Sequence, residues 1–131
     1  MFDQPIDHKN PAASTFHQLV RICVRDVNVP TVLHTDGYLL TYFPYTIHLT
    51  EALGANHVQI EHRYFGESKI LSDTRWEYLT LEQAAADQHA IIQALKPLLP
   101  KEWISTGNRK DGMTSVYLRY YYPDDIDVTT A

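Results

Sequence analysis

The segment Trp103-Ile-Ser-Thr-Gly-Asn-Arg-Lys-Asp-Gly112 decides how this sequence folds. Residues 102–106 have the pattern of a short strand, and a polar turn with a glycine at each end follows them. Residues 113–122 fit a helix by the spacing of their apolar side chains and a strand by their tyrosine-rich composition. The residues at helical spacing are Val116, Tyr117, Tyr120 and Tyr121. Both interpretations of this last stretch stay open.

Upstream, the pattern predicts several strands. Two of them, at residues 18–25 and 31–35, flank the polar turn 26–30 and together predict a β-hairpin. A third strand is expected at residues 57–62, where apolar and polar side chains alternate. Residues 1–15 are polar and interrupted by prolines, so they predict an irregular arm.

Two helices are expected between these strands. Residues 47–53 predict a short helix, which Gly54 would cap because glycine adopts the left-handed conformation cheaply. A longer helix begins at Thr80, where Gln83 completes a capping-box pattern, and it ends before Pro97. Because strands and helices alternate after the hairpin, we expect an α/β fold with parallel central strands and flanking helices.

Length and composition exclude several classes of protein. The 131 residues predict one domain, residues 1–131, and 44% hydrophobic with 21% charged residues is an ordinary globular composition. The net charge of −5 makes a nucleic-acid partner unexpected, and no apolar run is long enough to span a membrane. The single cysteine, Cys23, forms no internal disulfide, and its apolar neighbours predict a buried, inert thiol.

The turn after residues 102–106 has the context of a nucleophile elbow, the G-x-S-x-G turn between a strand and a helix. Gly107 occupies the position of the first glycine. Arg109 stands where the elbow has its nucleophile, and Asp111 stands where it has the second glycine. The turn therefore has the placement of a catalytic elbow without its nucleophilic side chain.

Further segments along the whole chain accompany this turn in a recognisable order. They are Gln4-Pro-Ile-Asp-His8, Thr15-Phe-His-Gln18, Thr35-Asp-Gly-Tyr38, Glu61-His-Arg-Tyr-Phe-Gly-Glu-Ser68, Leu81-Glu-Gln-Ala-Ala-Ala-Asp-Gln-His89, Gly112-Met-Thr-Ser115 and Tyr122-Pro-Asp-Asp125. In this order the segments resemble peptidase family S37, which includes bacterial tripeptidyl aminopeptidases and is distantly related to prolyl carboxypeptidases. The resemblance covers essentially the whole chain but only the N-terminal part of a family member.

The resemblance implies a partial, truncated α/β-hydrolase-like sheet. In such enzymes the elbow serine attacks a carbonyl, a histidine takes its proton, and an aspartate orients the histidine. The amide after the nucleophile, here that of Lys110, would help to form the oxyanion hole. The loop Gly37-Tyr38 is where a second oxyanion donor is expected, and no cofactor is implied.

Two departures from the family pattern predict that the chain is inactive as a serine peptidase. The Arg109 guanidinium stays protonated and cannot attack a carbonyl. The 22 residues after it contain no histidine, although the acid and histidine follow the nucleophile in this fold. Because the turn is polar and has no serine to position, we expect a relaxed backbone at Arg109.

Three hypotheses about function follow. The first is a catalytically inactive homologue or fragment of a secreted serine aminopeptidase, with a residual binding or structural role. The second is a piece of a serine hydrolase that needs another chain for activity. The third is an engineered or designed scaffold without a ligand. The first residues lack a signal-peptide pattern, whereas the family resemblance implies export, so the compartment stays open.

Candidate binding residues lie at the ends of the expected strands. Glu61, with His62 and Arg63, is expected to contact a substrate amine or carboxylate or, alternatively, to form a strand-end ion pair that anchors the loop to Ser68. Aromatic residues of the loop 36–46 line a peptide-binding groove or, alternatively, cover the edge of the core. They are Tyr38, Tyr42, Phe43 and Tyr45. The seven histidines show no zinc-motif spacing, so we expect no metal site.

Self-association is expected. A sheet that lacks its later strands would expose an edge next to residues 102–106, and exposed edges pair with other chains. The apolar and aromatic segment 116–122 is a second candidate interface. We therefore expect a homo-oligomer formed through the sheet edge or the C-terminal segment.

Overall fold

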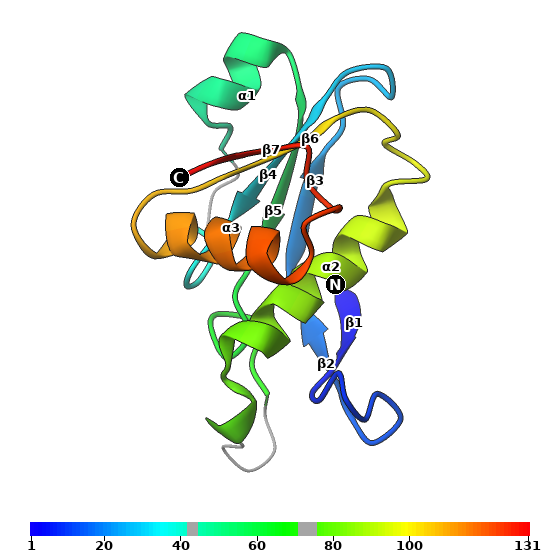
Figure 1. The fold of residues 1–131 in the computed structure, drawn as a ribbon, viewed down its shortest axis with the longest axis vertical. Coiled ribbons are helices and arrows are strands. Elements are labelled where there is room, and N and C mark those ends of the chain that lie inside the picture. Colours follow the sequence, from blue (N-terminus) through cyan, green and yellow to red (C-terminus); the bar gives the residue numbers. More distant parts are fainter. Residues whose placement is uncertain (42–44, 71–75) are drawn as a thin grey trace.

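The computed structural model describes residues 1–41, 45–70 and 76–131 and has a five-stranded mixed sheet at its centre (Figure 1). The strand order is β3-β5-β4-β6-β7. β3 runs antiparallel to β5, and the other neighbours are parallel. Their bounds are Val20–Cys23 for β3, Thr31–Thr35 for β4, Asn56–Ile60 for β5, Trp103–Thr106 for β6 and Val128–Thr130 for β7.

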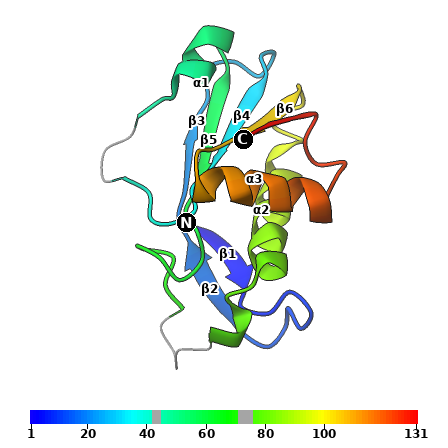
Figure 2. The ribbon, with the colours of Figure 1, turned by 60° about the vertical axis from the view of Figure 1, so that its left-hand side comes forward.

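Two helices cover one face of this sheet (Figure 2). They are α2, Leu81–Leu95, and α3, Lys110–Tyr121, and the short helix α1, His48–Leu53, lies at the end of the molecule. The core packs between sheet and helices, with Trp103 and Leu118 fully buried within it. Burial of these side chains supplies most of the drive for the layers to associate. The α/β class and the flanking helices are therefore confirmed.

The N-terminal hairpin is made by residues other than those predicted. β1, Phe2–Pro5, pairs antiparallel with β2, Thr15–Gln18, within and just after the expected irregular arm. The side-chain amide of Gln4 is buried and donates to the Gln18 side chain at 2.9 Å and to the Asp87 carbonyl of α2 at 2.8 Å. These long-range bonds fix a strand that its polar, proline-rich sequence did not indicate.

The predicted hairpin of residues 18–25 and 31–35 is wrong, because β5 lies between β3 and β4. Both β4 and β5 are buried along their whole length, and buried parallel strands belong at the centre of a sheet. β3 ends in exposed residues and takes the edge. Cys23 lies there and is exposed, so the expectation of a buried thiol is also wrong.

The local helix signals are confirmed in large part. Gly54 caps α1 in the left-handed conformation, and the Thr80 hydroxyl accepts from the Gln83 amide at 3.2 Å. The Gln83 side chain does not reach back to Thr80. It donates to Asp7 at 2.7 Å and accepts from the His8 amide at 2.9 Å, which ties the N-terminal loop to α2.

The open question at residues 113–122 is settled in favour of a helix, α3. Its buried residues include Thr114, Ser115 and Leu118, whereas Val116 and Tyr120 are exposed. The apolar spacing that indicated a helix therefore lies largely on the outer face. Within the described parts of the chain, no helix has both the length and the apolar character to cross a bilayer.

The sheet edge next to β6 is covered, contrary to the expectation from the sequence. β7 pairs with β6 in parallel, and the Ser105 hydroxyl donates to the Thr129 hydroxyl at 3.1 Å. β7 itself becomes the edge strand and has only three residues. Short edge strands offer few free backbone groups to another chain.

Candidate functional site

The turn between β6 and α3 keeps the backbone of a nucleophile elbow. Arg109 has φ 57° and ψ −120°, a positive-φ conformation that L-residues rarely adopt. Such backbone strain costs about 1–3 kcal/mol and persists only where the surroundings impose it. The expectation of a relaxed turn at Arg109 is therefore wrong.

Close approach of neighbouring backbones imposes this conformation. A side chain at Gly107 would collide with the backbone of Asp111, so only glycine fits there. Asp111 accepts on its backbone carbonyl from the hydroxyls of Thr35, at 2.8 Å, and Thr114, at 2.6 Å. These contacts fasten the start of α3 to the end of β4 and hold the elbow in place.

The Asp111 side chain is hydrogen-bonded to the Gly37 amide, in the loop where the second oxyanion donor is expected. Its Oδ1 atom accepts a hydrogen bond of 2.7 Å from the Gly37 amide. A glycine at position 111 would leave that amide available to a substrate oxygen. The carboxyl group at the second glycine position of the elbow thus lies on an amide that the family resemblance predicts as an oxyanion donor.

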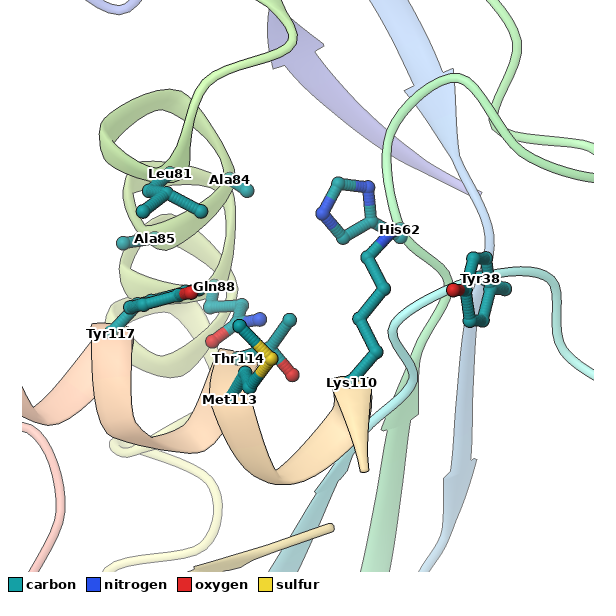
Figure 3. A pocket seen from close by; sticks show the side chains of 10 residues that line it. All are labelled: Tyr38, His62, Leu81, Ala84, Ala85, Gln88, Lys110, Met113, Thr114 and Tyr117. Carbon is teal, nitrogen blue, oxygen red and sulfur yellow. The ribbon is translucent and has the colours of Figure 1, made fainter. Parts of the chain in front are cut away.

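Lys110 and Tyr38 meet on the other side of the elbow, as Figure 3 shows. The Lys110 ammonium lies 4.1 Å from the centre of the Tyr38 ring and 4.7 Å from that of Phe65. Burial lowers the pKa of Lys110. Of the other aromatic residues of the loop 36–46, Tyr42 and Phe43 lie outside the described residues.

A cavity of about 260 Å³ opens beside this lysine, between α2 and α3 (Figure 3). Its walls are mainly apolar, with Leu81 and Ala85 from α2 and Met113 and Tyr117 from α3. A small site of this kind, with one cation at its rim, suits an apolar group that carries a negative end.

Glu61 fulfils the anchoring alternative of its two interpretations. Its carboxylate is 1% exposed and accepts from the amides of Leu40, Glu67 and Ser68 and from the Ser68 hydroxyl, at 2.8–3.0 Å. The contact with Ser68 is a set of hydrogen bonds rather than an ion pair. A carboxylate that is already hydrogen-bonded in this way holds the loop after β5 against the sheet.

A cluster that sequence reasoning missed lies at the C-terminal end of β4. One ligand atom from each of His34, Asp36 and Asp111 lies within 4.8 Å of the other two. Burial, reinforced by the charge of Asp111, raises the pKa of Asp36 to about 7, although Arg21 opposes the shift. Burial also lowers the pKa of His34. The i, i+2 spacing of His34 and Asp36 was the available signal, but Asp111 joins them only through the fold.

Comparison with known proteins identifies the ancestry of this fold. Residues 1–131 match the profile of the PS-10 peptidase S37 family. The chain belongs to the peptidase S37 family. It is 40% identical over 130 residues to the prolyl tri/tetrapeptidyl aminopeptidase of Streptomyces mobaraensis, covering 99% of this chain and 27% of that protein. It is 35% identical over 85 residues to the human lysosomal Pro-X carboxypeptidase, covering 57% of this chain and 17% of that one.

Solved structures confirm a partial α/β-hydrolase fold. The peptidase S37 chain superimposes on Rv0554 from Mycobacterium tuberculosis with a TM-score of 0.63 at 15% identity, covering 98% of this chain and 43% of that one. It superimposes on the proline iminopeptidase of Mycobacterium smegmatis with a TM-score of 0.62 at 14% identity, covering 98% and 42%. The chain thus spans about a quarter of the first relative and less than half of these structures.

Proposed function

We propose that this peptidase S37 chain has lost serine-peptidase chemistry and retains a binding or structural role. The observation that carries the proposal is Arg109 at the nucleophile position of an intact elbow. A guanidinium is a permanent cation in proteins and has no electron pair to offer a carbonyl carbon. The Asp111 carboxylate on the Gly37 amide adds a second obstacle, because it would repel the oxyanion of a tetrahedral intermediate.

Among the residues that the structure describes, the two serines near the elbow do not support nucleophilic chemistry. Ser105 and Ser115 are both fully buried. The Ser105 hydroxyl donates to Thr129, and the Ser115 hydroxyl lies 2.9 Å from that of Thr35. A serine nucleophile needs an adjacent base, and these partners are hydroxyls.

A fluorophosphonate probe tests the loss of serine reactivity. We expect no labelling of the purified chain under conditions in which a known serine hydrolase is fully labelled, because no described serine is both accessible and activated. Intact-mass spectrometry reads the result. A stoichiometric adduct on any serine of the chain contradicts the proposal.

A second candidate is a piece of a hydrolase that another chain completes. The chain spans 27% of the length of the aminopeptidase from Streptomyces mobaraensis. In that case the later strands of the α/β-hydrolase sheet would come from another polypeptide. The elbow would still have no nucleophile, because Arg109 stands at that position. Labelling of this chain only after addition of a partner would support the second candidate over the first.

Peptides are the ligands that we propose for a residual binding role. The relative is named for prolyl tri- and tetrapeptides. The cavity beside Lys110 supports the proposal, because it offers apolar walls to a side chain and one cation to a carboxylate. Calorimetric titration with proline-containing tripeptides tests it, and the Met113→Glu variant should bind more weakly. If the wild type releases no heat, the alternative of a scaffold without a ligand is favoured.

We also propose that the chain self-associates through the outer face of α3. Val116 and Tyr120 are 50% and 78% exposed on this helix, and exposed apolar side chains favour an interface. The short edge strand β7 contributes less, since it has only three residues.

Light scattering on a size-exclusion column measures the oligomer directly. We expect a folded dimer or larger species for the wild type and a monomer for Val116→Asp. The control is Val27→Asp, which adds the same charge at an equally exposed valine outside the helix and should leave the mass unchanged. A wild-type monomer at high concentration contradicts self-association.

A further inference from the structure

The cluster of His34, Asp36 and Asp111 combines donors that suit a transition-metal ion. His34 is the second-last residue of β4, and Asp36 directly follows that strand. Asp111 lies in the first turn of α3. Their three ligand atoms lie within 4.8 Å of one another. Ligands around a tetrahedral or octahedral metal are about 3–4 Å apart, given metal–ligand distances of about 2.0–2.2 Å. Small side-chain movements would therefore complete the site.

Unpartnered polar atoms supply an independent indication of a ligand. His34 is 6% exposed, and its Nδ1 atom has no hydrogen-bond partner among the described residues. Asp36 is 8% exposed, and its Oδ2 atom is also unpartnered within the part of the chain that the structure describes. Leaving such groups buried and unsatisfied destabilises the folded state. A bound cation would satisfy both at once.

We propose that His34, Asp36 and Asp111 bind a divalent transition-metal ion, with Zn²⁺ as the probe. One imidazole and two carboxylates match the nitrogen and oxygen donors that Zn²⁺ takes in proteins. The imidazole argues against Mg²⁺ and Ca²⁺, which prefer sites made of oxygen alone. The two carboxylates repel each other when both are charged, and a divalent cation between them removes that repulsion.

The site also has a route to solvent and room for water ligands. A cavity of about 450 Å³ adjoins it and is lined by His34 together with Gly107, Asn108 and His48. Three protein ligands leave at least one coordination position open, and water from this cavity can fill it. Metal sites need such an entry path.

Asp111 makes this site a property of the present chain rather than of the elbow in general. It stands at the second glycine position of the G-x-S-x-G pattern, where no side chain is available to bind metal. With glycine there, His34 and Asp36 would offer only two protein ligands. The same substitution that closes the oxyanion position on Gly37 therefore supplies the third ligand.

Isothermal titration calorimetry with ZnCl₂ alone tests the proposal. We expect one Zn²⁺ per chain with a dissociation constant in the micromolar range or below, and a higher melting temperature with metal, since an ion that binds the folded state stabilises it. The Asp111→Gly and His34→Gln variants should each weaken binding by about tenfold or more, because even changes outside the ligand set cost 10–100-fold.

Two controls keep the test decisive. His17 and Asp3 form an exposed imidazole–carboxylate pair with atoms 2.6 Å apart, and His17→Asn should leave Zn²⁺ affinity unchanged. Circular dichroism shows which variants fold, and Asp36→Asn replaces any variant that does not. The proposal is overturned if the wild type binds no Zn²⁺ at millimolar concentration, if the folded ligand variants bind as tightly as the wild type, or if His17→Asn removes binding.

Discussion

Replacing Arg63 with methionine is expected to lower the free energy of unfolding by about 3–5 kcal/mol, because it takes the guanidinium away from the buried Asp87 carboxylate, which keeps its 2.7 Å contact with the His8 imidazole. Arg63 is fully buried, and its guanidinium binds both oxygens of Asp87 at 2.8 Å. It also donates to the backbone carbonyls of Ile6 and Tyr78, at 3.0 and 2.9 Å. One side chain thus joins the N-terminal loop, the end of β5 and α2.

Urea denaturation followed by circular dichroism measures the effect. The control is Lys9→Met, which removes one partner of an exposed ion pair with Glu82, whose atoms lie 3.1 Å apart. Exposed pairs contribute about 0–1 kcal/mol, so the control should remain close to the wild type. Equal losses for both variants would show that the buried ion pair does not hold these segments together.

Replacing Trp103 with alanine is expected to lower the free energy of unfolding by about 3–5 kcal/mol, the range for large-to-small changes at buried aromatic residues. Trp103 is fully buried at the start of β6, within the core between the sheet and the helices. Its indole nitrogen donates to the Leu99 carbonyl at 3.0 Å. The substitution removes the ring, leaves a cavity, and deprives that carbonyl of its donor.

Trp76 provides the matched control, because it is the other tryptophan of the sequence and is 57% exposed. It stacks on Tyr64 with ring centres 5.1 Å apart, and such a contact contributes about 0.5–1.5 kcal/mol. Trp76→Ala should therefore shift the urea midpoint far less than Trp103→Ala. A larger shift at Trp76 would contradict the placement of the core.

The sequence predicts those features of the fold that local chemistry determines. The αL cap at Gly54 and the Thr80 cap depend on residues within one helical turn, and both form as expected. The pairing of strands is different, because it depends on which strands are buried on both faces. The predicted hairpin of residues 18–25 and 31–35 was wrong for this reason. β7 was not predicted, because three residues are too few to show an alternating pattern.

The candidate site likewise has some features that the sequence predicts and others that only the fold creates. The position of the elbow and the identity of Arg109 are visible in the sequence, but its strained backbone is not, because the polar turn itself requires no strain. Contacts formed in the fold hold it: the tight fit of Gly107 against the Asp111 backbone, the Thr114 hydroxyl on the Asp111 carbonyl, and the long-range bond from the Thr35 hydroxyl of β4 to the same carbonyl. The approach of Asp111 to His34 likewise arises only when β4 and α3 come together.

At Arg109 the backbone torsion angles and the side chain carry different information about the protein. The backbone alone has the strained strand-to-helix turn that is typical of a catalytic elbow. The Arg109 side chain at the same position supplies no nucleophile. Because Gly107 and the hydroxyls of Thr35 and Thr114 hold this part of the chain, the shape of the elbow does not require a serine at its tip. The backbone of the elbow therefore indicates which fold family the chain belongs to, whereas the side chain at position 109 determines what chemistry the elbow can perform.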